Sequence, residues 1–331
     1  MAQHYGLFMS SIALRVHPEV AEALATNCAV VALESTIFSN LGLPSPANAD
    51  ALERCVGVIR AEGAVPALTV VFDGVACIGV DDADVQRVLT GNRKCAERDL
   101  PVAIAQRWPV GCTTVSASLA IASAAGVQVF ATGGIGGVHR HDHLSGDVSA
   151  DLGALARYPV ITVTAGAKAF LDLAKTLELL DTLGVPVLGM RTDRFPAFYV
   201  RDSGLSVPHR IDDESEAAAV LMARLDLGMP GGVVVANPIP LEAELPADEI
   251  AAAITSALAD ADEAGLRGAA VTPFVLGRLA AATHGRSVPA NLALAEHNAG
   301  VAARIAVALS TQTTRAQQVG TADPTLSELS G

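Results

Sequence analysis

Short apolar runs alternate along the chain with longer segments in which apolar residues recur at helical spacing. The run at 29–33 (AVVAL) is continuous, as in a strand that is buried on both faces of a parallel sheet. The segment after Pro18 has the other pattern, because Val20, Ala21 and Leu24 share one helical face. Repeated alternation of the two patterns predicts an α/β fold.

The same patterns predict the remaining elements and the domain organisation. A strand is expected at 66–72, and a short one follows that ends at Ile78. Further strands are expected at 102–105, 127–131, 160–163, 185–188 and 232–236. Helices are expected from an N-cap at Asn48 to Gly63, at 82–89, after Thr113, and at 168–180, 213–225, 247–264, 273–283 and 290–309. Since no repeat or linker interrupts this pattern, we predict one three-layer α/β/α domain over 17–309, with a mostly parallel mixed sheet. A flexible segment at 1–16 and a disordered polar tail at 310–331 would flank it.

Composition and charge narrow the class of function. Hydrophobic residues make up 51% of the 331 residues and aromatic residues only 4%, so alanine, valine and leucine must fill the core. A formal charge of -13 argues against a nucleic-acid partner, although backbone N–H groups can still capture one small phosphate. The five cysteines form no CxxC pair, and we find no signal peptide or membrane-spanning run, which indicates a soluble cytoplasmic protein with reduced thiols.

A glycine-rich stretch from Ala131 to Arg140 is the main candidate for ligand binding. Four glycines lie within 133–137, directly after a predicted strand, and their N–H groups could surround an anion such as a phosphate. Asp147 and Asp151 follow and could hold a hard metal ion beside that phosphate. The alternative is a mobile loop that only covers the end of the sheet.

Reactive side chains are expected after the strands, because ligands gather beyond the carboxyl ends of the strands in α/β sheets. Lys168 follows small residues, and a helix N-terminus beside it would favour the neutral, nucleophilic amine; the alternative is a solvated surface lysine. Glu34 ends the first strand, where it is either a general acid or a carboxylate paired with a cation or backbone amide.

Each metal-binding candidate, taken alone, is weak evidence for a metal site. Asp147 could hold Mg²⁺ or Mn²⁺ mainly through water, but an aspartate in a polar loop is also typical of a turn. The alternation of His139, His141 and His143 does not favour zinc, because it would place all three on one face of an unsupported edge. We assign His139 to the pocket and expect the other two to be exposed loop residues.

Twelve blocks in order along nearly the whole chain point to one family. They are ALESTI (32–37), GLPSPAN (42–48), GAVPA (63–67), RDLP (98–101), TTV (113–115), FATGGIGGVHR (130–140), DVSADL (147–152), AGAK (165–168), FPAFY (195–199), VANPIP (235–240), TPF (272–274) and NA (298–299). With these blocks the chain resembles the pseudouridine-5'-phosphate glycosidase family, also called the indigoidine synthase A-like family.

The resemblance implies a reaction and two catalytic residues. Family members reversibly split pseudouridine 5'-phosphate, with water, into uracil and ribose 5-phosphate, using a divalent metal that is typically Mn²⁺. Lys168 would attack the anomeric carbon while Glu34 protonates the departing ring oxygen, and an imine of the opened ribose would form. Because a carbon–carbon bond breaks, the mechanism of ordinary glycosidases, which uses a pair of carboxylates, does not apply to this reaction.

The resemblance also implies a binding pocket, a metal ligand and an assembly. Asp147 would bind Mn²⁺ (or Mg²⁺), Lys94 would help to neutralise the phosphate, and the chain would form a homotrimer. The implied substrate-binding residues are Lys94, Thr114, Val115, Thr132, Gly133, Gly134, His139, Ser149, Asp151 and Asn298. The chain departs from the family pattern at Ser39–Leu41, at Gly146 before the metal aspartate, and at 268–271.

Two other functions stay open at this point. A metal-dependent phosphosugar lyase or aldolase would use the same lysine on another carbonyl compound and would release no uracil. A catalytically silent metabolite-binding protein would bind ribose 5-phosphate without turnover.

Overall fold

A computed structural model describes residues 14–140, 146–266 and 271–322, with side chains as far as Thr314. Its strands form one eleven-stranded sheet in the order β1-β4-β3-β2-β7-β8-β11-β9-β10, with β6 beside β3 and β5 beside β6. The strands are β1 (Leu14–Val16), β2 (Val30–Leu33), β3 (Val65–Phe72), β4 (Val75–Ile78), β5 (Lys94–Cys95), β6 (Val110–Thr113), β7 (Val129–Ala131), β8 (Ile161–Thr164), β9 (Val187–Met190), β10 (His209–Ile211) and β11 (Val233–Ala236).

Parallel pairing dominates the sheet. The strands from β3 through β2 to β10 pair in parallel, whereas β3 pairs antiparallel with β4 and β6. The short strands β2, β7, β8, β9 and β11 are wholly buried, which explains their unbroken apolar sequences. The prediction of a mostly parallel, mixed sheet is confirmed.

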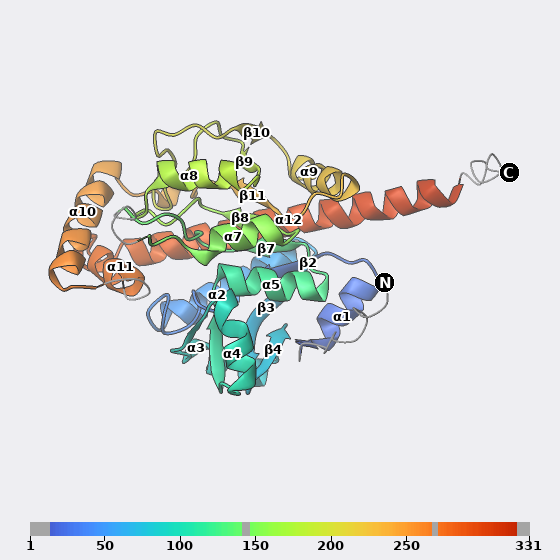
Figure 1. Cartoon of the computed structure of the whole chain (residues 1–331), viewed down its shortest axis with the longest axis horizontal. Coiled ribbons are helices and arrows are strands. Elements are labelled where there is room, and N and C mark those ends of the chain that lie inside the picture. Colours follow the sequence, from blue (N-terminus) through green and yellow to red (C-terminus); the bar gives the residue numbers. More distant parts are fainter. Residues whose placement is uncertain (1–13, 141–145, 267–270, 323–331) are drawn as a thin grey trace, which may run out of the picture.

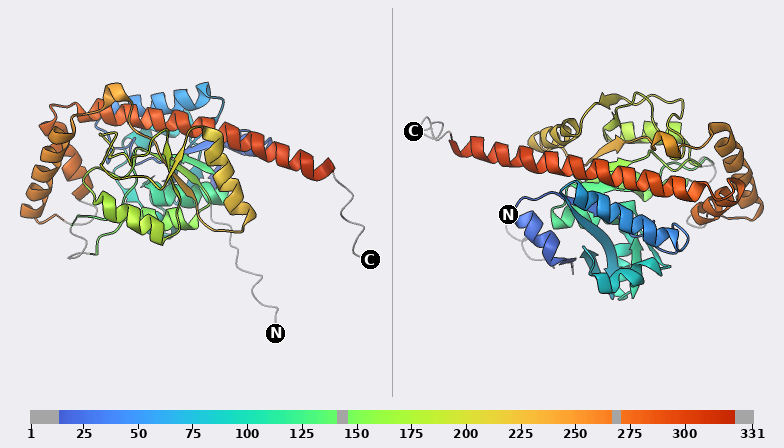
Figure 2. Two further views of the ribbon diagram at one scale, coloured as in Figure 1. Left: turned by 90° about the horizontal axis from the view of Figure 1, so that it is seen from above. Right: turned by 180° about the vertical axis from the view of Figure 1, so that it is seen from behind.

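Helices cover both faces of the sheet and complete three layers (Figures 1 and 2). In one layer α12 packs against α2 and α9, and in the other α7 packs against α5 and α8. A pair formed by α10 and α11 lies at one end of the molecule. The helices are α1 (Pro18–Ala25), α2 (Ala47–Ala61), α3 (Asp82–Leu89), α4 (Leu100–Ala105), α5 (Val115–Ala125), α7 (Ala150–Arg157), α8 (Leu173–Thr182), α9 (Glu214–Asp226), α10 (Ala247–Glu263), α11 (Val271–Ala282) and α12 (Ser287–Ala322), with 3₁₀ turns η1 (Glu97–Asp99) and η2 (Leu241–Ala243).

The long helix α12 runs across the junction of β2, β7 and β8. Within the described chain it contains the one stretch, Ser287–Thr314, that is apolar and long enough to cross a membrane, but 67% of its most apolar window is buried in the protein. This is the burial of a core helix in a soluble fold.

The ends of the domain differ from the prediction. The helix continues beyond Leu309 to Ala322, because Asn27 donates to Ser310 O and Thr314 Oγ1 and Gln312 donates to Ser215 O. At the other end β1 pairs with β4, so part of the segment predicted to be flexible adds a strand to the sheet. Residues 1–13 and 323–331 lie outside the described part of the chain.

Two internal predictions are also corrected. The strand expected at 102–105 is the helix α4, in which Pro101 occupies the first turn and Val102 is 41% exposed. The helix expected from Lys168 begins only at Leu173, because the Asp172 side chain accepts from Lys175 N and caps it there. Lys168 therefore lies in the loop before α8 and not in the first turn of that helix.

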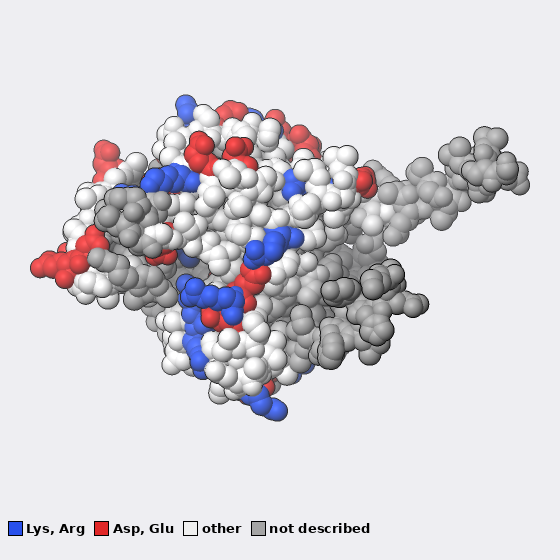
Figure 3. Space-filling view, viewed as in Figure 1, with Lys and Arg blue, Asp and Glu red and all other residues white. Residues whose placement is uncertain are grey.

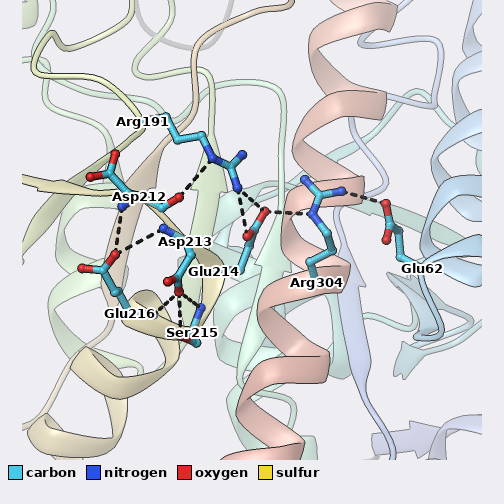
Figure 4. Close-up of polar contacts among 8 residues, drawn as sticks. All are labelled: Glu62, Arg191, Asp212, Asp213, Glu214, Ser215, Glu216 and Arg304. Carbon is cyan, nitrogen blue, oxygen red and sulfur yellow. Dashed lines mark hydrogen bonds and ion pairs between the residues drawn. The ribbon is translucent and has the colours of Figure 1, made fainter.

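A network of charged side chains joins α12 to both halves of the sheet (Figure 4). Arg304 donates to Glu62, which ends α2, at 2.7 Å and to Glu214 in α9 at 2.8 Å. Arg191, after β9, also donates to Glu214. The elements that follow β2 and β9 are thereby tied to the same helix.

The surface charge is unevenly distributed. Acidic side chains gather at the end of the molecule formed by α10, whose sequence is ADEIAAAITSALADADE (Figure 3). Elsewhere on that face of the described chain, basic side chains lie next to acidic ones and do not form a stripe.

Candidate active site

The candidate site lies where three neighbouring parallel strands end. Because β7 lies between β2 and β8, the residues that follow these strands meet at one edge of the sheet. They include Glu34 after β2, Thr132 after β7 and the loop to Lys168 after β8. The prediction that these segments converge is confirmed.

Glu34 is a buried carboxyl group with one close partner. Its side chain accepts a hydrogen bond from the Thr132 hydroxyl, and the residue is only 8% exposed. Burial raises the pKa of Glu34 to about 6, although the charge of Lys168 and the Thr132 hydrogen bond both oppose the rise. A carboxyl group with this pKa can hold a proton near neutral pH and give it to a reacting atom.

Lys168 is placed by backbone hydrogen bonds rather than by a helix. Its N–H donates to Ile135 O at 3.1 Å, and a bridge between Ile135 and Ala167 aligns its loop with the glycine segment. Its charge acts on Glu34, Lys94 and His139, so these four side chains share one electrostatic environment. A lysine near a carboxyl group whose pKa is raised is an arrangement that suits nucleophilic attack with acid assistance.

Lys94 reaches the same environment from β5. Partial desolvation and the charge of Lys168 lower the pKa of Lys94, although its side chain as a whole is exposed. Two cations held close together attract an anion, such as the phosphate group of a substrate.

The glycine loop, which follows β7 from Thr132, is closely packed against the rest of the protein. A β-carbon on Gly134 would lie 2.5 Å from the ring of Phe198, so only glycine fits there. On the other side, the Asn298 amide donates to Thr132 O at 2.8 Å and to Gly133 O at 3.3 Å. Close packing thus explains glycine at 134.

Asp151 ties the loop to two helix N-termini. Its carboxylate accepts from Ser116 N at 3.0 Å and from Gly136 N at 2.8 Å, while its own N–H donates to Ser149 Oγ, the N-cap of α7. Thr114 and Val115, at the start of α5, are buried beside it. Both carboxylate oxygens are therefore engaged by backbone, which makes Asp151 an organising residue of the site.

His139 and Asp147 face each other across the loop. The His139 N–H donates to Asp147 O at 3.1 Å, and Nε2 lies 3.8 Å from Asp147 Oδ2. Desolvation lowers the pKa of His139, although the charge of Asp147 opposes this shift. His141 and His143 lie outside the described residues.

The side chains around Asp147 suit only a hard cation that keeps part of its water shell. Among the described residues no three His, Cys, Asp or Glu side chains cluster closely enough to hold a metal ion by themselves. One carboxylate can still hold Mg²⁺ or Mn²⁺ when water and a substrate phosphate complete the coordination.

Asn298 belongs to a chain of buried amides. Its Oδ1 accepts from Asn237 Nδ2 at 2.9 Å, and the same Nδ2 lies 3.1 Å from His297 Nδ1. Asn298, which was predicted to bind substrate, uses its Nδ2 group to hold Thr132 and Gly133, while its Oδ1 is engaged by Asn237. Sequence reasoning missed Asn237 and His297, although His297 directly precedes Asn298 in the sequence.

Two surface hollows lie elsewhere. One of about 480 Å³ lies between α8 and the segment before β10, and one of about 150 Å³ lies beside the N-terminus of β2. Neither is lined by Glu34 or Lys168, and among the described residues neither holds a group of His, Cys, Asp and Glu side chains that could bind a metal ion. We therefore place the chemistry at the strand ends.

The model of the family described as "Indigoidine synthase A like protein" matches residues 19–308. The chain belongs to the indigoidine synthase A-like family. Within this family it is 49% identical over 309 residues to a protein from Methylobacterium nodulans, covering 93% of this chain and 91% of the other. It is 48% identical over 298 residues to one from Myxococcus xanthus, covering 89% and 98%. Both relatives are named pseudouridine-5'-phosphate glycosidase.

Solved structures of the indigoidine synthase A-like fold agree. The prealnumycin C-glycosynthase AlnA in complex with ribulose 5-phosphate superimposes with a TM-score of 0.84 at 36% identity, covering 91% of this chain and 98% of that chain. An indigoidine synthase A-like protein from Thermotoga maritima gives a TM-score of 0.81 at 32% identity, covering 90% and 96%. The α/β fold expected from the resemblance is therefore the fold of the family.

Proposed function

We propose that this protein is a pseudouridine-5'-phosphate glycosidase, which reversibly cleaves the C-glycosidic bond to give uracil and ribose 5-phosphate. Nearly full-length relatives at 48–49% identity carry that name. The observation in the structure that supports it best is the buried Glu34 carboxyl, which has a pKa of about 6 and lies beside Lys168.

The first step opens the ribose. The Lys168 nitrogen attacks the anomeric carbon, so that a carbon–nitrogen bond forms and the bond to the ring oxygen breaks. Glu34 gives its proton to that oxygen, because burial raises the pKa of this carboxyl group to about 6 and keeps the proton on it at higher pH than on an ordinary glutamate. The Thr132 hydroxyl keeps the carboxyl group oriented.

The second step breaks the carbon–carbon bond. The nitrogen bonded to the anomeric carbon gives up one proton, which restores its lone pair. A proton adds to the uracil carbon that carries the sugar, and the electron pair of the broken bond stays with the base. The lone pair of the Lys168 nitrogen forms the C=N bond of an iminium. Water then adds to that carbon, which releases ribose 5-phosphate and restores the lysine amine.

The phosphate and a divalent metal would lie beside this centre. Lys94 and backbone N–H groups of the glycine loop would bind the phosphate. The Asp147 carboxylate would hold Mn²⁺, or Mg²⁺, through water, and the ion would neutralise phosphate charge. Asp151 and Ser149 keep the loop in place for this contact.

The assembly and compartment follow from the family resemblance and the thiols. We expect a homotrimer, which light scattering coupled to gel filtration would test. All five cysteines are free, and only Cys28 is exposed, which favours a reducing, cytoplasmic environment.

The test is uracil release from pseudouridine 5'-phosphate with and without Mn²⁺. We expect metal-dependent release by the wild type and none by Lys168→Ala or Glu34→Ala, while both variants stay folded. Well-folded, metal-loaded wild type that releases no uracil would contradict the proposal.

A second function is favoured by one specific observation, the likeness to a C-glycosynthase. The TM-score of 0.84 at 36% identity is compatible with an enzyme that joins a sugar phosphate to another ring. This second function would be excluded if the protein releases uracil faster than it joins a sugar phosphate to any other ring.

A further inference from the structure

Three polar side chains are hydrogen-bonded in series and end at the glycine loop. Asn298, on α12, holds the loop, because its Nδ2 donates to Thr132 O at 2.8 Å and to Gly133 O at 3.3 Å. Its Oδ1 accepts from Nδ2 of Asn237, the residue that follows β11, at 2.9 Å. The same nitrogen lies 3.1 Å from His297 Nδ1. The series therefore runs from a half-buried imidazole through two buried amides to the loop.

The two loop carbonyl groups fix the direction of every hydrogen bond in this series. A carbonyl oxygen only accepts, so Asn298 must turn its NH₂ group to the loop and its oxygen to Asn237. Asn237 must then supply an N–H to that oxygen, which leaves the second N–H of the same NH₂ group for His297 Nδ1. His297 Nδ1 is the acceptor at which the series ends, and it can accept only without a proton.

The surroundings of His297 favour this neutral form. Its ring also hydrogen-bonds to the backbone of Pro238, which has no N–H and must accept, so the ring proton lies on Nε2. Desolvation has the largest effect on the pKa of His297 and lowers it, and the charges of Arg304 on α12 and Arg201 lower it further. The Pro238 hydrogen bond and the Glu242 carboxylate in η2 oppose this shift without reversing it.

A proton on His297 Nδ1 would disturb the whole series. Two donors would then face each other, and Asn237 could accept from the ring only by turning its oxygen to the place of its NH₂ group. That oxygen would face Asn298 Oδ1, and a matching turn of Asn298 would set its oxygen against the two loop carbonyls. Each arrangement leaves buried polar atoms unpaired, which folded proteins avoid.

We propose that His297 is a positioning residue of the active site, because its unprotonated Nδ1 orients Asn237 and thereby Asn298. Asn298 in turn holds Thr132 where its hydroxyl meets the Glu34 carboxyl group. This inference rests on the proposed function and goes beyond it, because it assigns control of the site to a residue that acts through others.

The first experiment compares the kcat of uracil release at pH 8 between variants that keep or remove the acceptor. His297→Leu removes it, and we expect kcat to fall about tenfold or more. His297→Asn places an amide oxygen near the position of Nδ1, so its kcat should fall less than about threefold. His209→Leu removes an exposed histidine from β10 and should leave kcat unchanged.

The pH profile gives a readout that a purely structural role would not move. Lys168 and Glu34 titrate in both wild type and His297→Asn, so the ratio of the two kcat values isolates the imidazole. The wild-type value should fall relative to that of His297→Asn as pH drops below 6.5, because only wild type gains a proton at this position. This fall should coincide with protonation of the His297 ring, followed by ¹⁵N NMR.

Three results would overturn the inference. They are full activity of folded His297→Leu, a kcat ratio that stays constant over the pH range in which the ring becomes protonated, and an NMR spectrum at pH 8 with the ring proton on Nδ1. Wild type that neither makes nor cleaves pseudouridine 5'-phosphate would overturn the proposed function instead, and the position of the ring proton would still test the hydrogen-bonded series.

Discussion

The Thr132 hydroxyl donates a hydrogen bond to the buried carboxylate of Glu34, which connects the first residue of the glycine loop to the acid of the proposed reaction. Thr132 is itself held by Asn298, whose amide donates to its carbonyl oxygen at 2.8 Å. The protonation of Glu34 and the position of the glycine loop are therefore coupled.

Replacing Glu34 by glutamine should stabilise the protein at neutral pH. The pKa of Glu34 is about 6 in the fold against an ordinary 4.5, so above pH 6 the folded state bears a cost of about 2 kcal/mol for the buried charge. Below pH 4.5 both states are protonated and the cost vanishes. Urea unfolding of Glu34→Gln should show a gain at pH 8 that disappears near pH 4, and the exposed Glu53→Gln should show neither.

Removing the Thr132 hydroxyl should shift the pH profile of cleavage. As a general acid, Glu34 loses its proton as pH rises through about 6, so kcat/KM should fall above that pH. The Thr132 hydrogen bond lowers the pKa of Glu34, and Thr132→Val should therefore move this fall to higher pH. Thr162→Val, matched in size and burial, is the control. Identical profiles for wild type and Thr132→Val would count against Glu34 as the acid.

Adding a methyl group at position 134 should displace the loop. A β-carbon there would lie 2.5 Å from the Phe198 ring, so Gly134→Ala should destabilise the protein by about 1–3 kcal/mol and reduce uracil release. Phe198→Leu in the same chain should recover part of both losses. Gly57→Ala is the matched control, because nothing lies within 4 Å of that point in α2, and it should stabilise the protein by about 0.5–1 kcal/mol.

Breaking the charge network on α12 should weaken the fold in a pH-dependent manner. Burial alone would raise the pKa of Glu214, but Arg304 and Arg191 overcome it, and the net pKa is lowered. The stability from this carboxylate is present above pH 4.5 and is lost as pH falls through its lowered pKa. Thermal unfolding should show that Arg304→Met loses about 1–3 kcal/mol at pH 7 and less in acid. The exposed Arg54→Met should change stability by less than about 0.5 kcal/mol.

The sequence predicted the central sheet well because its strands are buried on both faces, which imposes unbroken apolar runs such as β2 and β11. It failed at α4, where Val102 and Ile104 look like a strand but Pro101 starts a helix with one buried residue, Ala103. It also missed β5, which is only two residues long and is defined by its pairing with β6. Tertiary contacts, not local pattern, decide such segments.

For the site, the sequence identified the residues that follow the strands, because parallel strands deliver their ends to one edge. It could not show that Asp151 and Asn298 are engaged by backbone groups, since that depends on the path of the glycine loop. The link from His297 through Asn237 to Asn298 was equally hidden, because only the position of α12 beside the residue that follows β11 reveals it.

The most direct test of the central claim is to trap the bond between the sugar and Lys168. Wild type would be incubated with ribose 5-phosphate and borohydride, digested and analysed by mass spectrometry. We predict a reduced ribose 5-phosphate adduct on the Lys168 side chain, absent from Lys168→Ala and competed by uracil. An adduct on Lys94 instead, or no adduct in wild type that releases uracil, would contradict Lys168 as the nucleophile.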